Sequence, residues 1–317
     1  MPTGTKGGLT ERRTGVYNKL SPLGRGAAAG PIQAWRYSSQ GASPPERSAW
    51  KENLLAHVHY IGHATVLIDI GHIRVLTDPI LRDRLLFLQR HGPNPAPDML
   101  EGRPPDLVIL SHLHYDHTDL PSLRGLERTT PLIAPRGTGQ YLQRNTGLEI
   151  YEMAAGEKVG VADVEITALP AEHGWAMPVL RPMTTCLSYT LCNHLSVYFA
   201  GDTDLFEGMN DIGAEYDLDL ALLPVWGFGP RVGGGHLTPL TAAHALTMLR
   251  PRVAVPIHWG ALRYPGPQAL WQTVDFMHTP PHAFAEHAAS LAPETEVRVV
   301  QPGHSTAIGA AGRICLS

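Results

Sequence analysis

The sequence contains few cysteines and few charged residues, and both scarcities narrow the class of protein. Its three cysteines, Cys186, Cys192 and Cys315, include no C-x-x-C pair. An odd number without that spacing argues against a disulfide framework and against a cysteine zinc site, so we expect a reducing, cytoplasmic setting. Charged residues make up 17% of the chain and hydrophobic residues 43%, which predicts a packed core rather than general disorder. No apolar run approaches the roughly 18 residues of a membrane-spanning helix.

Positive charge is also scarce over most of the chain, whose formal net charge is -4. Proteins that bind nucleic acid usually carry a basic face or stripe, so no nucleic-acid partner is expected. The exception is residues 1–53, which are basic, rich in Gly, Ser and Pro, and without a hydrophobic period. We interpret them as a poorly ordered N-terminal arm, whose charge leaves peripheral contact with an anionic membrane open. Residues 54–317 are predicted to form the folded domain.

Short apolar runs separated by turn residues predict a domain with more strands than helices. The expected strands span residues 57–61, 65–70, 73–78, 107–110, 164–169, 186–192, 196–200, 218–223, 253–257 and 297–300. The expected helices span 137–146, 238–249 and 266–278, and a further one begins at Thr118–Pro121 with Thr118 as its cap. This pattern suits an α/β (α+β) domain in which two mixed sheets pack face to face with helices outside.

The run Ser111-His112-Leu113-His114-Tyr115-Asp116-His117 places four metal-competent side chains directly after a predicted buried strand. Imidazole and carboxylate groups are natural ligands of zinc and similar metals. In an extended segment His112 and His114 point to the same side, and a bend at Tyr115 can turn Asp116 and His117 toward a second ion. A histidine-rich surface loop is the plainer interpretation, but sites are usually built on loops that a rigid scaffold positions.

Three further candidates each follow a strand-like run: His173 after 166–170, Asp202 after 196–200, and His258 after 253–257. Taken alone, each has a plain interpretation, because a lone histidine is more often structural and an aspartate before threonine often forms a turn. Together with the first motif they complete a set of seven, and coincidence becomes a poor explanation. The predicted metal ligands are His112, His114, Asp116, His117, His173, Asp202 and His258.

The H-x-H-x-D-H motif, the later lone histidine, the G-D-T turn at 201–203 and the segment His258-Trp259-Gly260 resemble the metallo-β-lactamase superfamily. Three segments, Gly62-His63-Ala64-Thr65, Thr77-Asp78-Pro79 and residues 256–260, resemble its branch that contains N-acyl-phosphatidylethanolamine phospholipase D and the UlaG-like lactonases. The resemblance covers roughly residues 58–303 and implies a four-layer αββα sandwich. The motifs are highly specific for the fold and weakly specific for the substrate.

By matching position, the resemblance also implies a role for each site residue. The implied ligands of the two ions, which share Asp202 as a bridge, are His112, His114 and His173 for one ion and Asp116, His117 and His258 for the other. Asp78 matches an acidic residue that supports a metal-bound histidine from outside the ligand shell, where such a partner fixes the imidazole tautomer. His63 is expected beside the metals in the same supporting shell.

Two divalent ions about 3.5–4 Å apart can share a water, lower its pKa and polarise a phosphoryl or carbonyl oxygen. The resemblance therefore implies a hydrolase that uses a metal-bridging hydroxide, with Zn²⁺ as the expected metal and Mn²⁺ or Fe as alternatives. Asp116, Asp202 and His236 are the expected catalytic residues. His236 follows three glycines and matches a substrate-facing histidine that would donate a proton to a leaving oxygen or bind a phosphate. A locally stabilised histidine at a helix start is the plainer interpretation.

Four functions stay open on the sequence alone. A phosphodiesterase of the phospholipase D type, acting on a small-molecule or lipid-like substrate, is preferred, and a lactonase or similar carboxylic-ester hydrolase is the alternative. Among iron-dependent oxidoreductases, a diiron enzyme is less favoured, because the diiron members carry Glu where His114 stands, whereas a mononuclear-iron sulfur dioxygenase stays open until the metal is analysed. A non-catalytic binding protein is disfavoured by the intact ligand set. Asp204 and Glu172 depart from the phospholipase pattern, which weakens any transfer of the phospholipid substrate.

Overall fold

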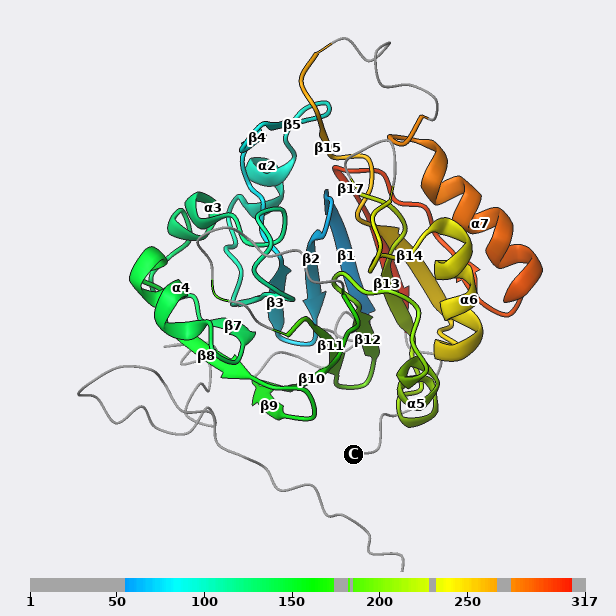
Figure 1. Ribbon diagram of the computed structural model, residues 1–317. Helices are drawn as coiled ribbons and strands as arrows, with labels where there is room; N and C mark the ends of the chain where they lie inside the picture. The colour runs from blue at the N-terminus through cyan, green and yellow to red at the C-terminus, as the bar shows by residue number, and fades with distance from the viewer. Residues whose placement is uncertain (1–54, 174–181, 183–184, 228–231, 267–274, 310–317) are drawn as a thin grey trace, which may run out of the picture.

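Two seven-stranded sheets pack face to face in the computed structural model (Figure 1), which describes residues 55–173, 182, 185–227, 232–266 and 275–309. The first sheet contains, in spatial order, β17 (His304–Gly309), β1 (Leu55–Gly62), β2 (Thr65–Ile70), β3 (Ile73–Thr77), β6 (Leu107–Ile109), β7 (Leu132–Pro135) and β8 (Ile150–Met153). The second contains β16 (Glu296–Val297), β14 (Val253–Ile257), β13 (Leu220–Pro224), β12 (Ser196–Phe199), β11 (Leu187–Cys192), β10 (Val164–Pro170) and β9 (Lys158–Val161). Both sheets combine antiparallel and parallel pairs, so both are mixed, as predicted.

The space between the sheets is filled by one apolar core, to which alternate residues of a strand contribute. In β2, Val66, Ile68 and Ile70 belong to this core, whereas Leu67 belongs to a second apolar cluster on the other face of the sheet. This period of two is what a strand buried on both faces shows. β14 is buried along its whole length. Strand ends in such sheets are held rigidly, which suits them to position side chains.

Helices cover the outer faces and complete the four layers that the resemblance implied (Figure 1). On the first sheet, α3 (Leu120–Arg124) and α4 (Gly139–Thr146) contribute Leu123 and Leu142 to the cluster that includes Leu67. The helices that pack on the second sheet are α5 (Gly208–Glu215), α6 (Pro239–Leu249) and α7 (Thr279–Leu291). The remaining elements are α2 (Ala96–Leu100) and a small sheet of β15 (Leu262–Arg263), β5 (Leu88–Arg90) and β4 (Arg84–Leu85).

Several predicted elements have the expected bounds, and others need correction. β2 and β14 match the predicted ranges, and α6 begins directly after Thr238, which caps it. The expectation that Thr118 caps α3 is wrong, because Asp119 accepts the hydrogen bond from the Ser122 backbone while Thr118 Oγ1 donates to His112 O at 2.7 Å.

Some predicted elements lie outside the described residues, and others differ from the elements found. The predicted N-terminal arm and most of the helix predicted at 266–278 lie outside the described residues. The last predicted strand, 297–300, is found instead as the two-residue strand β16. α7, which begins at Thr279, was not predicted. None of the described helices is long and apolar enough to cross a membrane.

Candidate metal centre

Strand ends from both sheets carry the predicted site residues. In the first sheet β1, β3 and β6 run in one direction, since β2 is antiparallel to β1 and to β3, and β3 is parallel to β6. In the second sheet β10, β12 and β14 also share one direction. The residues that follow these six carboxyl ends are His63, Asp78 and His112 in the first sheet and His173, Asp202 and His258 in the second. The topology thus gathers residues that are far apart in the chain.

The loop after β6 turns back at Tyr115, as predicted. His117 N and Thr118 N both donate to His114 O, at 3.1 Å and 2.9 Å. Thr118 Oγ1 closes the loop by donating to His112 O at 2.7 Å. Because of this turn, the first two histidines of the motif join one group of side chains and its last two members, an aspartate and a histidine, join another.

The first cluster consists of His112, His114 and His173. Their ring centres are 4.4 Å apart for His112 and His114 and 4.8 Å apart for each of the other two pairs. Two imidazoles bound to one tetrahedral ion, with metal–nitrogen bonds of about 2.0–2.1 Å, have ring centres about 5 Å apart. The spacing of the three rings therefore suits a shared ion.

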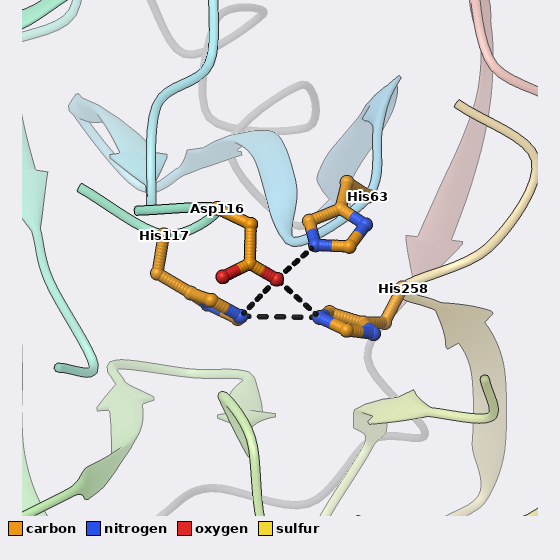
Figure 2. Close-up of side chains that lie close together, drawn as sticks. All are labelled: His63, Asp116, His117 and His258. Carbon is orange, nitrogen blue, oxygen red and sulfur yellow. Dashed lines mark hydrogen bonds and ion pairs between the residues drawn. The ribbon is translucent and has the colours of Figure 1, made fainter. Parts of the chain in front are cut away.

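The second cluster of predicted ligands consists of Asp116, His117 and His258, and His63 lies in the same group of metal-competent side chains (Figure 2). His117 Nε2 and His258 Nε2 are 3.1 Å apart, and each is 3.7 Å from Asp116 Oδ2. The ring centres of the two histidines are 5.1 Å apart, which again suits a shared ion. The second cluster thus offers two imidazoles and one carboxylate.

Asp202 lies between the two clusters. Its Oδ1 is 3.1 Å from His258 Nε2, and its Oδ2 is 3.0 Å from His117 Nε2 and 4.0 Å from His173 Nε2. The preceding residue, Gly201, has φ +60°, and a Cβ there would lie 2.5 Å from the Cβ of Ser111. Glycine thus lets the chain bring the carboxylate close to the loop after β6. This is the place that the predicted bridging role requires.

Hydrogen bonds behind the rings fix which imidazole nitrogen faces the centre. His117 Nδ1 donates to Asp78 Oδ2 at 2.7 Å, and His258 Nδ1 donates to Trp226 O at 2.6 Å. A carboxylate or carbonyl oxygen only accepts, so each Nδ1 carries a proton, and the neutral form of each ring directs an unprotonated Nε2 inward. Metal ligation needs this tautomer.

Ser111 extends the same support to the first cluster. Its Oγ donates to Asp78 Oδ2 at 2.6 Å and accepts from His112 Nδ1 at 2.9 Å, while its backbone N donates to Asp78 Oδ1 at 2.8 Å. His173 Nδ1 donates to Gly235 O at 2.7 Å. One carboxylate, Asp78, therefore orients an imidazole in each cluster. Neither Ser111 nor the supporting carbonyl groups were predicted, because their residue types carry no signal without the fold.

The carboxylates of the centre, of which Asp78 and Asp202 are buried, create a local need for positive charge. Within the described part of the chain, Asp78, Asp116 and Asp202 form ion pairs with imidazoles and with no Lys or Arg. Burial raises the pKa of Asp202, but the charges of His117 and His258 outweigh burial and hold that pKa well below its ordinary value. Burial lowers the pKa of His117, but the three carboxylates outweigh burial and hold it well above its ordinary value.

A buried nitrogen without a partner and a close pair of ring nitrogens supply a further reason to expect cations. The Nε2 atoms of His117 and His258 face each other at 3.1 Å, so at most one of them can direct a proton at the other. His112 Nε2 is buried and has no hydrogen-bond partner among the described residues. Burial holds the pKa of His112 well below its ordinary value, so this ring is neutral, as a ligand must be. Buried polar atoms need a partner, and the cluster is able to bind metal.

The two other predicted site residues also lie at the centre. His236 Nε2 is 3.3 Å from Asp202 Oδ2, and its side chain is 25% exposed, so solvent reaches it. His63 is buried, and its Nε2 is 2.9 Å from Asp116 Oδ2 (Figure 2). The structure thus brings together every residue that the sequence nominated for the site, while the individual roles stay predictions.

The sandwich and its clustered imidazoles and carboxylates define a protein of the metallo-β-lactamase fold with a centre able to bind metal. A family model described as "Beta-lactamase superfamily domain" matches residues 73–259. The chain belongs to this superfamily, which confirms the resemblance seen in its motifs.

Relatives of similar sequence come from bacteria, archaea and animals. An uncharacterized protein of Mycobacterium tuberculosis is 33% identical over 222 residues, 65% of this chain and 59% of the relative, so the chain spans about three fifths of that relative's length. A UPF0173 metal-dependent hydrolase of Methanopyrus kandleri is 30% identical over 78% of this chain and 98% of the relative. The N-acyl-phosphatidylethanolamine-hydrolyzing phospholipase D 1 of Caenorhabditis elegans is 28% identical over 63% of each chain.

Solved structures confirm the fold. Igni18, a metallo hydrolase from Ignicoccus hospitalis, superposes with a TM-score of 0.62 at 23% identity, covering 80% of this chain and 98% of that chain. An isothiocyanate hydrolase from Delia radicum gut bacteria gives a TM-score of 0.61 at 17% identity, with 80% and 100% covered. At such identities the likeness concerns the fold and carries no substrate to this chain.

Proposed function

We propose that this protein is a hydrolase that cleaves phosphodiester bonds with two divalent ions, zinc being the preferred metal. The observation that carries the proposal is the position of Asp202 between two three-residue clusters. Paired metal sites clamp both the attacking and the leaving oxygen of an in-line phosphoryl displacement. Likeness to the UPF0173 metal-dependent hydrolases supports metal-dependent hydrolysis, and likeness to the phospholipase D of Caenorhabditis elegans supports a small-molecule or lipid-like phosphodiester.

The residues of the chain bind, orient and move a proton in this proposal. When bound, two divalent ions supply Lewis acidity and a water whose pKa falls toward about 7. The hydrogen bonds at Nδ1 of His112, His117, His173 and His258 keep these rings in place, so they need little reorganisation during the reaction. Asp116 and Asp202 would supply negative charge that offsets the repulsion between two bound cations. His236, which is partly exposed and next to Asp202, would donate a proton from Nε2 to the leaving oxygen.

Metal quantification and a paired activity assay test the proposal. Purified protein loaded with Zn²⁺, Mn²⁺ or Fe²⁺ is assayed on bis(p-nitrophenyl) phosphate and on a lactone panel. We expect two ions per chain, diester hydrolysis, and loss of most activity in Asp202→Ala. Asp211→Ala, which removes an exposed aspartate on α5, is the matched control and should behave as wild type.

Two outcomes would change the conclusion. Diester hydrolysis that survives Asp202→Ala unchanged would remove the two-ion mechanism. Lactone turnover without diester turnover would replace the phosphodiesterase with a lactonase. The cytoplasmic setting is part of the same proposal and depends on the cysteine pattern alone.

A further inference from the structure

The turn between β1 and β2 places a buried histidine against the second cluster. His63 is 1% exposed, and its ring points at the Asp116 carboxylate (Figure 2). His63 Nε2 is 2.9 Å from Asp116 Oδ2. Because an ionised carboxylate only accepts, His63 Nε2 donates this hydrogen bond. The turn between β1 and β2 therefore holds the side chain of Asp116, which lies in the loop after β6.

The spacing of the rings argues that His63 is not itself a ligand of the ion that His258 would bind. The ring centres of His63 and His258 are 3.7 Å apart, whereas those of His117 and His258 are 5.1 Å apart. Two imidazoles on one tetrahedral ion have ring centres about 5 Å apart. The His117–His258 spacing fits this value, whereas His63 is too close to His258 for both rings to bind one ion, although its ring centre is 5.6 Å from that of His117. His63 thus supports the cluster from one side.

The same turn holds a second ligand through its backbone. His258 N donates to His63 O at 2.8 Å, and His258 has φ +65° there. Gly62 has φ +126°, and a Cβ at that position would lie 2.6 Å from the Cβ of Ala261. Glycine at this point therefore allows the turn to approach the segment that carries His258.

We propose that His63 is a positioning residue that sets the affinity of the ion in the second cluster and not that of the ion in the first. The inference rests on the two-ion centre of the proposed function. The His63 ring fixes Asp116 through Nε2–H, and the His63 carbonyl group fixes His258. Two of the three ligands of the second cluster therefore share one support. An outer partner of this kind is typically worth about 10–100-fold in metal affinity.

Cobalt binding tests the inference without any substrate. His114→Ala removes a ligand of the first cluster and leaves the second to be titrated, and His258→Ala does the reverse. On the His114→Ala background, His63→Phe should weaken Co²⁺ binding about 10–100-fold and reduce the visible absorption of the bound ion. On the His258→Ala background the same substitution should change the affinity little. His63→Gln keeps a donor near the position of Nε2 and should recover most of the loss.

His59→Gln is the matched control, since His59 also lies on β1 and hydrogen-bonds an aspartate, Asp69, at 3.0 Å outside the metal centre. It should leave both affinities unchanged. Unchanged Co²⁺ affinity of the second cluster in His63→Phe would overturn the inference. Equal losses on both backgrounds would overturn it as well, because they would indicate a general structural role. If His63→Phe does not fold, His63→Met fills the space without a donor and is judged by the same two comparisons.

Failure of the proposed function gives a different pattern. A chain that binds two ions, loses one with His63→Phe and cleaves no phosphodiester would refute the phosphodiesterase and leave this inference standing. Wild-type protein that binds a single ion would overturn the inference directly.

Discussion

Replacing Asp78 with asparagine should weaken both proposed metal sites, because this carboxylate orients an imidazole in each cluster. Asp78 is fully buried and accepts from three donors: His117 Nδ1, Ser111 Oγ and Ser111 N. Asparagine has nearly the same size but only one acceptor oxygen. If that oxygen keeps the bond from Ser111 N, the new amide nitrogen faces His117 Nδ1 and Ser111 Oγ. At both contacts, one hydrogen-bond donor would then face another.

This conflict is relieved by a change of tautomer in each cluster. His117 must move its proton from Nδ1 to Nε2. Ser111 Oγ must turn to accept from the amide and donate to His112 Nδ1, which moves the His112 proton to Nε2 as well. Both Nε2 atoms would then point a hydrogen at the position of an ion. Because an orienting partner is worth about 10–100-fold in affinity, we expect a loss of about that size in each cluster. If the amide turned round, its nitrogen would face Ser111 N, and both groups are donors. Leaving these donors without an acceptor would cost about 1–3 kcal/mol of stability.

Equilibrium dialysis against buffered Zn²⁺, followed by metal quantification, measures both affinities. Ser111→Ala is the matched comparison, because it breaks only the branch that leads to His112, and it should weaken the first cluster alone. Thermal unfolding in the presence of a chelator separates loss of the fold from loss of metal. Wild-type affinity for both ions in Asp78→Asn would refute the tautomer argument.

Three other substitutions test separate features. His236→Gln should slow hydrolysis of a diester with an alkyl leaving group by about 10²–10⁴-fold and affect a p-nitrophenyl diester much less, because nitrophenolate leaves without a proton; equal losses would contradict the proton-donor role. Gly201→Ala should lower the free energy of unfolding, measured in urea, by about 2 kcal/mol, because φ is +60° and the new Cβ would lie 2.5 Å from that of Ser111. An unchanged midpoint of urea unfolding would show that the turn relaxes and would contradict this prediction. Burial raises the pKa of Asp69, but hydrogen bonds from two neighbours outweigh burial and hold it below its ordinary value. Asp69→Asn should therefore cost about 1–2 kcal/mol at pH 7, and this difference in thermal stability should shrink as the pH falls below about 4, the unfolded pKa; a difference independent of pH would contradict the assignment.

The clustering of the nominated residues could be predicted because each of them follows a strand that can be recognised from its own residues. β14 is a short apolar run with the predicted bounds, and His258 follows it directly. Ends of strands that run in one direction meet at one edge, so a ligand after each such strand predicts a common site. His173 and Asp202 follow the same logic at the ends of β10 and β12. Short segments of sequence were therefore enough to predict that these distant residues lie close together in the fold.

The contacts that orient the ligands could not be predicted in this way. Ser111 and the carbonyl groups of Trp226 and Gly235 act through position alone, and that position depends on which atoms the fold places behind each ring. α7 was missed for a local reason, since Pro280 and Pro281 resemble a helix break, although proline is tolerated in the first turn of a helix. Two-residue strands such as β16 carry no periodic signal.

Three residues at the centre hold a left-handed backbone that glycine would adopt more easily: His63 with φ 59°, Asp78 with φ 34° and His258 with φ 65°. Such a conformation costs about 1–3 kcal/mol for each residue and persists only where the surrounding structure holds it. Here His258 N donates to His63 O at 2.8 Å, and Asp78 N donates to Ile109 O at 3.1 Å. Glycine would relieve the strain but remove the side chains that the centre requires. Because backbone hydrogen bonds within the first sheet and between the two sheets hold this geometry, the predicted ligands face inward by virtue of the fold itself, and binding of a cation would demand little further rearrangement of the chain.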